Sequence, residues 1–204
     1  EICLRNLNDM ENIMLKKEDL YKLEEYSIER KKFKSEVLAT KKHRSILVGN
    51  HINLLFENSL TIKYQIQEML RIEKIFESEL IQEELDTYNP LIPEGKNLKA
   101  TMLIEYSDVS ERKIKLQKLK GVEKKIWIKV GTNDLVYPIA DEDLEREDDT
   151  KTSAVHFLRW EFSKNQIHDF KNGSPVSIGV IHPEYDASHI ITESVRFELA
   201  KDFI

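Results

Sequence analysis

The longest apolar pattern in this chain has a helical period, the apolar segments beyond it have mainly a strand period, and this contrast limits which folds are open to the chain. From residue 61 to about residue 86, apolar side chains recur three or four positions apart, which is typical of the buried face of an α-helix. These side chains are Ile62, Ile66, Met69, Leu70, Phe76 and Leu80. Beyond residue 98 the chain instead carries short segments rich in β-branched and aromatic residues, which are typical of strands.

Shorter segments complete the pattern. Further helices are predicted over residues 17–26, 27–44, 110–119 and 193–203, with Ser27 as the cap of the second. Two strands are predicted within residues 45–57, meeting at Gly49-Asn50, and others over 99–106, 125–130, 135–140, 153–162 and 175–182. Helices come first and strands follow without a regular βαβ repeat, which predicts an α+β fold. We expect N-terminal helices and one long amphipathic helix to pack on an antiparallel or mixed β-sheet.

The domain prediction is a loose N-terminal arm over residues 1–16 and a single α+β domain over residues 17–204. An apolar share of 40% with 33% charged residues is ordinary for a folded globular chain of 204 residues. Cys3 is the single cysteine, so one chain can build neither a disulfide framework nor a cysteine metal cluster. No apolar run approaches the roughly twenty residues of a membrane span, and the first residues do not resemble an export signal. We therefore expect a cytoplasmic protein that does not bind membranes.

Charge argues against a nucleic-acid-binding function. The formal net charge is -6, whereas phosphate binding depends on clustered Lys and Arg. The basic residues between Arg30 and Arg44 are the local exception, and we interpret them as a solvated helix face rather than an anion or partner site. Phosphate loops, dinucleotide fingerprints, nucleophile elbows and zinc-protease motifs are all absent. The motifs therefore identify no reaction.

Several polar residues occupy positions where the periodicity calls for apolar ones. On the wheel of the long helix, Glu73 falls inside the apolar stripe, Glu68 lies toward its edge, and Arg71 lies on the far side. A buried carboxylate persists only with a partner, so Glu73 is expected to be buried and paired.

Two histidines repeat this pattern on strands. His156 starts the apolar row that continues through Leu158 and Trp160, and His182 ends the row of the strand over residues 175–182. Imidazoles and carboxylates at element ends can form a mixed nitrogen and oxygen site for iron, manganese or zinc. The candidate ligands are His156, His182, Glu57, Glu68, Glu73 and Glu105. The alternative is that these are ordinary hydrogen-bonded polar groups of the core, and the spacing does not decide between the two.

A series of sequence blocks is similar to a known family. The blocks are FEN at 56–58, YQIQEMLRIEKI at 64–75, YNPLIP at 88–93, KATMLIE at 99–105, KTSAVHFLRWEF at 151–162 and HPEYDA at 182–187. Together they resemble the bacterial domain-of-unknown-function family 3501 (DUF3501) over nearly the whole chain after residue 17. The resemblance implies no established activity. Genes of this family often lie beside those for rubrerythrin-like proteins and Fe–S oxidoreductases, which implies a role in redox or peroxide defence.

Two functions therefore stay open. The first is a cytosolic accessory protein that binds a redox partner such as a rubrerythrin-like protein or an Fe–S oxidoreductase, and the missing catalytic motifs favour it. The second is a metal-dependent enzyme whose non-haem iron, manganese or zinc ion activates water or oxygen, and the misplaced polar residues favour it. Self-association into a homo-oligomer is left open.

Overall fold

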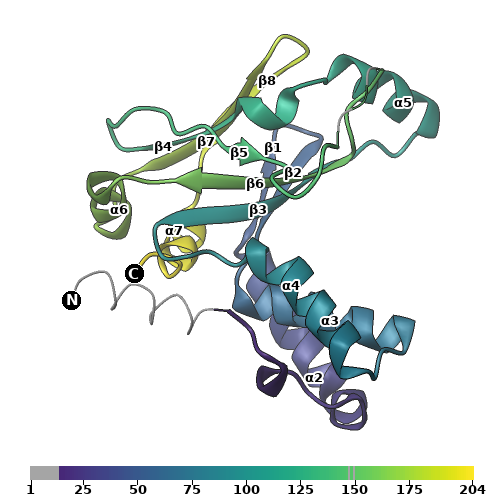
Figure 1. Cartoon of the computed structure of the whole chain (residues 1–204). Coiled ribbons are helices and arrows are strands. Elements are labelled where there is room, and N and C mark those ends of the chain that lie inside the picture. Colours follow the sequence, from purple (N-terminus) through teal and green to yellow (C-terminus); the bar gives the residue numbers. More distant parts are fainter. Residues whose placement is uncertain (1–13, 147, 149) are drawn as a thin grey trace. The chain divides into compact units, whose positions relative to one another are not determined.

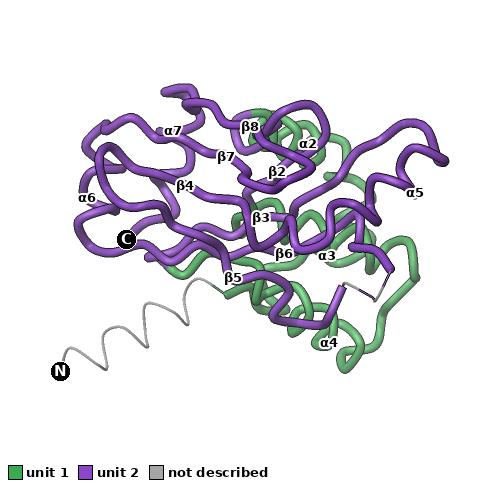
Figure 2. Tube along the Cα trace, turned by 90° about the horizontal axis from the view of Figure 1, so that it is seen from above, with its two compact units in different colours: residues 1–42, 57–94 green, residues 43–56, 95–204 purple. Residues whose placement is uncertain are grey.

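The computed structural model describes residues 14–146, 148 and 150–204, and it contains α-helices together with antiparallel strands (Figure 1). This confirms the predicted α+β class. The chain divides into two compact units, coloured separately in Figure 2. Unit 1 consists of Glu1–Lys42 and Glu57–Glu94, and unit 2 consists of His43–Phe56 and Gly95–Ile204. The single domain predicted over residues 17–204 stays a prediction, and most of the predicted arm lies outside the described residues.

Unit 1 is helical. Its elements are η1 (Lys17–Asp19), α2 (Leu23–Lys42), α3 (Ser59–Glu73), α4 (Ser78–Tyr88) and η2 (Asn89–Leu91). Helix α3 begins where the Asn58 side chain accepts the Thr61 backbone N–H at 3.0 Å while the Thr61 hydroxyl accepts the Asn58 N–H, a reciprocal cap. Ile62, Ile66 and Leu70 then form the buried stripe of α3.

The prediction of one long helix over residues 61–86 is wrong, because the helix breaks at Lys74. This residue adopts φ 57° and ψ 45°, and its N–H closes the last turn on the Leu70 carbonyl. The left-handed turn carries the buried Ile75 into the core of the unit, and α4 starts three residues later. Apolar spacing continues across the break, which is why it resembled a single helix.

Two other helix boundaries also differ from the prediction. Residues 23–42 form one helix, α2, rather than two, because Tyr26, Phe33 and Val37 bury one continuous stripe. Ser27 therefore lies inside the first turns of α2 and is not its cap. The part of residues 17–26 that precedes α2 is the short η1 and an extended connection.

Unit 2 contains two antiparallel sheets. The first is ordered β1 (Ser45–Val48), β2 (Ile52–Phe56), β3 (Asn97–Ile104), β6 (Val155–Glu161) and β5 (Ile139–Ala140). The second is ordered β4 (Ile126–Val130), β7 (Val176–His182) and β8 (Tyr185–Ile190). Residues from both sheets, among them Leu54, Trp160 and Ile178, belong to one hydrophobic cluster. Alternate residues of β6 are buried, as the strand period predicted.

The remaining elements of unit 2 are helical. They are α5 (Val109–Lys118), η3 (Val122–Lys125), α6 (Lys164–Lys171) and α7 (Glu193–Ala200). The sequence did not predict α6 or β8. Helix α6 buries only Phe170, and β8 is an exposed, largely polar strand, so neither carries a strong apolar period. Within the described residues, no helix combines the length and the apolar character that crossing a bilayer requires.

Candidate functional site

One carboxylate in unit 1 holds two guanidinium groups from different helices. Glu68 of α3 accepts hydrogen bonds from Nε and Nη2 of Arg30, which lies on α2, at 2.7 and 2.9 Å. It also accepts Nη2 of Arg71 at 3.1 Å and the hydroxyl of Tyr26 at 2.6 Å. The hydrogen bond from Arg30, with further bonds from Tyr26 and Arg71, lowers the pKa of Glu68 to about 2. Glu68 is therefore ionised at neutral pH and fixes the two arginines beside one another.

The two arginines line a basic pocket. We use this name for the cavity of about 450 Å³ lined by Leu23, Ser27, Arg30, Arg71, Lys74 and Phe76. The Arg30 and Arg71 side chains are 35% and 41% exposed, so their charges reach solvent. Their Nη1 atoms have no hydrogen-bond partner among the described residues, and neither does the Lys74 amine. Three cations therefore face one cavity, with one carboxylate behind two of them.

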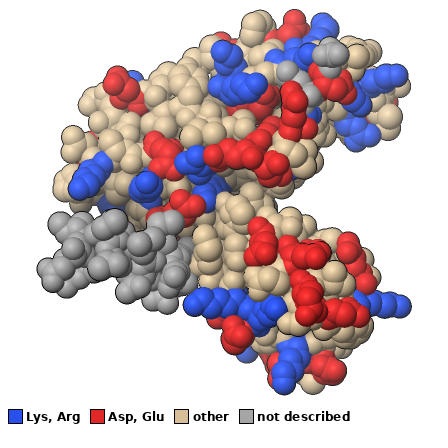
Figure 3. All heavy atoms as spheres, in the orientation of Figure 1, with Lys and Arg blue, Asp and Glu red and all other residues tan. Residues whose placement is uncertain are grey.

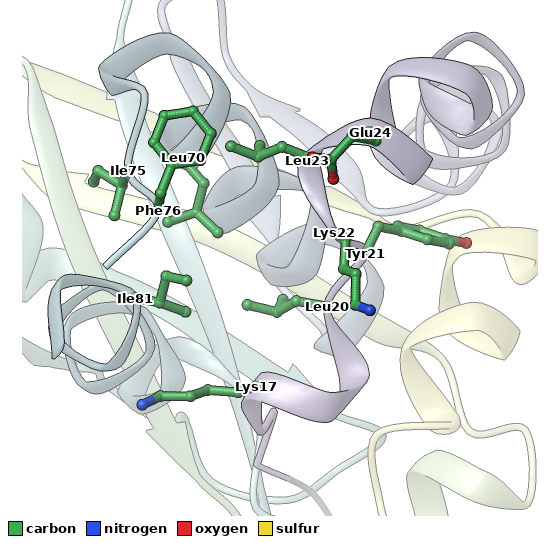
Figure 4. Close-up of a pocket in the computed structure, with 10 residues that line it drawn as sticks. All are labelled: Lys17, Leu20, Tyr21, Lys22, Leu23, Glu24, Leu70, Ile75, Phe76 and Ile81. Carbon is green, nitrogen blue, oxygen red and sulfur yellow. The ribbon is translucent and has the colours of Figure 1, made fainter. Parts of the chain in front are cut away.

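An apolar pocket lies next to the basic one, since Leu23 and Phe76 line both. It has a volume of about 240 Å³, and its apolar lining includes Leu20, Leu70 and Ile81 (Figure 4). In Figure 4, Leu20 and Ile81 point toward one another across the pocket from different segments. The Lys17 amine donates to the Ser78 hydroxyl at 2.7 Å, which ties η1 to α4 at this pocket. Joined in this way, the two pockets can hold a ligand that has an apolar body and an anionic head.

Acidic residues of unit 1 gather elsewhere. In Figure 3 carboxylates cluster over α4, which carries Glu79, Glu83, Glu84 and Asp86. Burial, together with the charges of Glu73 and Glu83, raises the pKa of Glu84. Unit 1 therefore carries an acidic surface on α4 in addition to the basic pocket.

The predicted ligands of unit 1 do not share one role. Glu73 is exposed, so the prediction that it is buried is wrong. The i, i+4 spacing of Ile62, Ile66 and Leu70 points toward residue 74, where the helix ends, and Ile75 takes the core position instead. Glu57 is buried and accepts the Thr61 hydroxyl beside the cap of α3. Glu68 is the residue already described in the arginine cluster.

The predicted ligands of unit 2 lie apart in their contacts. Glu105 is exposed, and its carboxylate accepts a long hydrogen bond, 3.4 Å, from the Asn53 amide. His182 ends β7 as predicted, is half-buried, and its Nε2 lies 3.0 Å from the Lys120 carbonyl. His156 belongs to the other sheet and is fully buried.

His156 stands between a carboxylate and a hydroxyl. Its Nδ1 donates to Asp141 at 2.6 Å, and its Nε2 lies 2.9 Å from the Thr152 hydroxyl and 3.0 Å from the Ser153 carbonyl. The order hydroxyl, imidazole and carboxylate is that of a Ser-His-Asp catalytic triad, with threonine in place of serine. However, Thr152 is 1% exposed and His156 is 0% exposed, so a substrate cannot reach the hydroxyl. The arrangement instead clamps both ends of the segment 141–152 to β6.

No metal centre assembles from these residues. Among the described residues, no group of three or more His, Cys, Asp or Glu side chains is arranged to hold a metal ion. His156 and His182 have separate partners on separate sheets, as described above. Metal binding therefore stays a prediction that the geometry does not strengthen.

The arginine cluster was not predicted from the sequence. Arg30 was expected on a solvated face and Arg71 on the far side of the helix. Phe76, which was expected in the buried stripe, is 66% exposed. Arg30 and Glu68 lie 38 residues apart, so no local spacing signals their pairing. One sequence feature could have indicated the cluster. Arg71 and Lys74 lie at the end of the i, i+4 apolar stripe, and side chains at the end of a helix can face a cavity.

Comparisons with known proteins place the chain in a family without assigning it a function. Residues 14–203 match the family described as a protein of unknown function (DUF3501). A solved structure, described as a novel protein of unknown function from Burkholderia pseudomallei K96243, shares 46% sequence identity with the chain and has a TM-score of 0.90. The similarity covers 94% of this chain and all of that one. No curated protein matches. The chain belongs to the DUF3501 family.

Proposed function

We propose that unit 1 is a binding module for an amphipathic anion, which places its acidic head in the basic pocket and its apolar body in the apolar pocket. The observation that carries the proposal is the pair of arginines held side by side by Glu68 at a cavity that opens beside an apolar one. This function is that of an accessory or binding protein and requires no catalytic group. The redox partner implied by the family resemblance is a separate prediction.

The geometry supports recognition of a compact anion by hydrogen bonds. Arg30 and Arg71 each use one edge of the guanidinium on Glu68 and keep the Nη1 end for another oxyanion. Because Glu68 already fixes both side chains, little rotamer entropy is lost when an anion binds. Leu23 and Phe76, which line both pockets, would contact the ligand next to its head.

The proposal is tested by isothermal titration calorimetry with octanoate, an eight-carbon chain that ends in a carboxylate. Phe76→Ala removes apolar lining and Arg71→Gln removes one of the facing cations, so each should weaken binding about tenfold. Phe197→Ala is the matched control, because Phe197 is 65% exposed, almost the same as Phe76, but lies in unit 2. Lys34→Gln is the control for charge, since Lys34 is exposed on α2 and does not line the basic pocket.

Equal affinities in all four variants and the wild type would place binding elsewhere. If neither octanoate nor the other amphipathic anions named below bind at millimolar concentration, unit 1 is not such a module.

A further inference from the structure

We infer that the anionic head recognised by the basic pocket is a dianionic phosphate monoester rather than a carboxylate. The inference rests on the proposed function and adds the chemical class of the head. It follows from the number, placement and charge of the donors that face the pocket.

The net charge of the basic pocket favours a dianion. Among the residues that line the basic pocket, Arg30, Arg71 and Lys74 supply three positive charges, and Glu68 behind the arginines supplies one negative charge, which leaves two net positive charges. The charged residues of the apolar pocket, Lys17, Lys22 and Glu24, add no net negative charge. Tyr26 and Tyr64 are the neighbouring phenols, and burial raises the pKa of each, so both stay neutral. A phosphate monoester carries close to two negative charges above its second pKa of roughly 6, whereas a carboxylate carries one. The dianion therefore matches the charge of the site.

The placement of the cations around the basic pocket favours a tetrahedral head group. The three cations come from separate places, namely Arg30 on α2, Arg71 on α3, and Lys74 at the C-terminal cap of α3. The free ends of both guanidinium groups and the rotating amine can each take a different acceptor. A phosphate monoester offers three terminal oxygens in a tetrahedral arrangement, and the Ser27 hydroxyl adds a further donor. A planar carboxylate has only two oxygens and would leave one cation unpaired.

The backbone conformation of Lys74 supports a functional role for its side chain. Lys74 and Asp141 are the two non-glycine residues with positive φ among the described residues. Asn or Gly would serve such a helix end at lower conformational cost, yet this chain places a lysine there, and that lysine lines the basic pocket. Such strain is found where a side chain has a functional position.

The experiment compares three ligands with the same eight-carbon chain: octyl phosphate, octyl sulfate and octanoate. At pH 8 the phosphate is a dianion, the sulfate a tetrahedral monoanion and the carboxylate a planar monoanion. Calorimetry should show octyl phosphate binding about tenfold more tightly than either of the others. At pH 5.5, where the phosphate is mainly a monoanion, its advantage over octyl sulfate should fall to less than about threefold.

Lys74→Gly supplies the matched variant. Glycine prefers the backbone conformation of this position, so the substitution removes the charge without straining the turn. The preference for phosphate over sulfate at pH 8 should fall to about twofold, whereas Lys34→Gln should keep it. Vesicles of phosphatidylcholine with and without phosphatidic acid present the same head group in lipid form. Capture by the phosphatidic acid vesicles, in addition to binding of octyl phosphate, would identify a lipid source, and binding of octyl phosphate alone would identify a free ester.

Two negative results have different meanings. If octanoate binds as tightly as octyl phosphate at pH 8, the phosphate inference is wrong and the binding module remains. If none of the three ligands binds, the proposed function fails as well.

Discussion

The Glu68 carboxylate and the Arg30 guanidinium form a two-point ion pair, with Nε to Oε1 at 2.7 Å and Nη2 to Oε2 at 2.9 Å. The pair joins α3 to α2 and sets the position of a cation at the basic pocket. One interaction thus serves both the packing of unit 1 and the proposed site.

Acid should destabilise the wild-type protein through Glu68. Its pKa is about 2 in the folded protein, below the ordinary value of 4.5, because Arg30, Tyr26 and Arg71 hydrogen-bond the ionised form. Its stabilisation is therefore complete above pH 4.5 and is lost as the pH falls toward 2. Urea unfolding between pH 2.5 and 6 should show a wild-type stability that falls toward that of Glu68→Gln. A difference between the two proteins that stays constant over this range would contradict the prediction.

Asp202 should give the opposite pH dependence. It is paired with Arg44, whose side chain is fully buried, yet burial raises the pKa of Asp202 to about 6 against the attraction of that arginine. The folded state thus holds a proton that the unfolded state releases near pH 3.8. The contribution of Asp202 to the free energy of unfolding is full below pH 3.8 and is lost as the pH rises through about 6.

The check on Asp202 compares the wild type with Asp202→Asn between pH 5 and 7.5. The stability of the wild type relative to the variant should increase as the pH is lowered. A relative stability that instead increased with pH would show that Arg44 outweighs burial and that the pKa of Asp202 is lowered.

Gly179→Ala should destabilise unit 2 by more than about 2 kcal/mol. A Cβ at this position of β7 would lie 2.4 Å from the Trp127 ring and 2.7 Å from the Ser188 Cβ, and the sheet cannot move away from both. Gly121→Ala is the control, because no heavy atom lies within 4 Å of its Cβ and its cost is limited to the strain of φ +76°, about 1 kcal/mol. Thermal unfolding measures both. If Trp127→Ala does not partly restore the stability of Gly179→Ala, the clash with the ring is not the cause.

His156→Ala should cost about 2–4 kcal/mol, because it leaves a cavity and removes the hydrogen bond to Asp141 in the core. The amide of Phe157, which donates to Asp141 at 2.9 Å, should then exchange its hydrogen faster. His182→Ala should cost less than about 1 kcal/mol, since His182 is half-buried and its partners, the Lys120 carbonyl and the Glu184 N–H, are backbone groups near the surface. Equal costs in the two variants would disprove the clamp. Elemental analysis of the same proteins tests metal binding, which requires stoichiometric metal in the wild type and its loss in both variants.

Local patterns were sufficient for most elements of the fold. The alternation of His156, Leu158 and Trp160 predicted a strand with one buried face, and β6 has that face. The Gly49-Asn50 pair correctly predicted the turn between β1 and β2, where Tyr185 accepts the Asn50 N–H at 2.9 Å. These features depend on residues that are close together in the sequence, so they can be predicted from the sequence alone.

Contacts between distant residues could not be predicted in this way. The periodicity of residues 61–86 continues across Lys74 although the helix does not, because the turn is stabilised by burying Ile75 against residues of other helices. The same break exposes Glu73 and Phe76 and brings Arg71 and Lys74 to a cavity with Arg30. The spacing of apolar residues in helices and strands follows from backbone geometry, so it can be recognised in a short stretch of sequence. A binding site arises from packing between elements, and the partner of each side chain depends on the path of the whole chain.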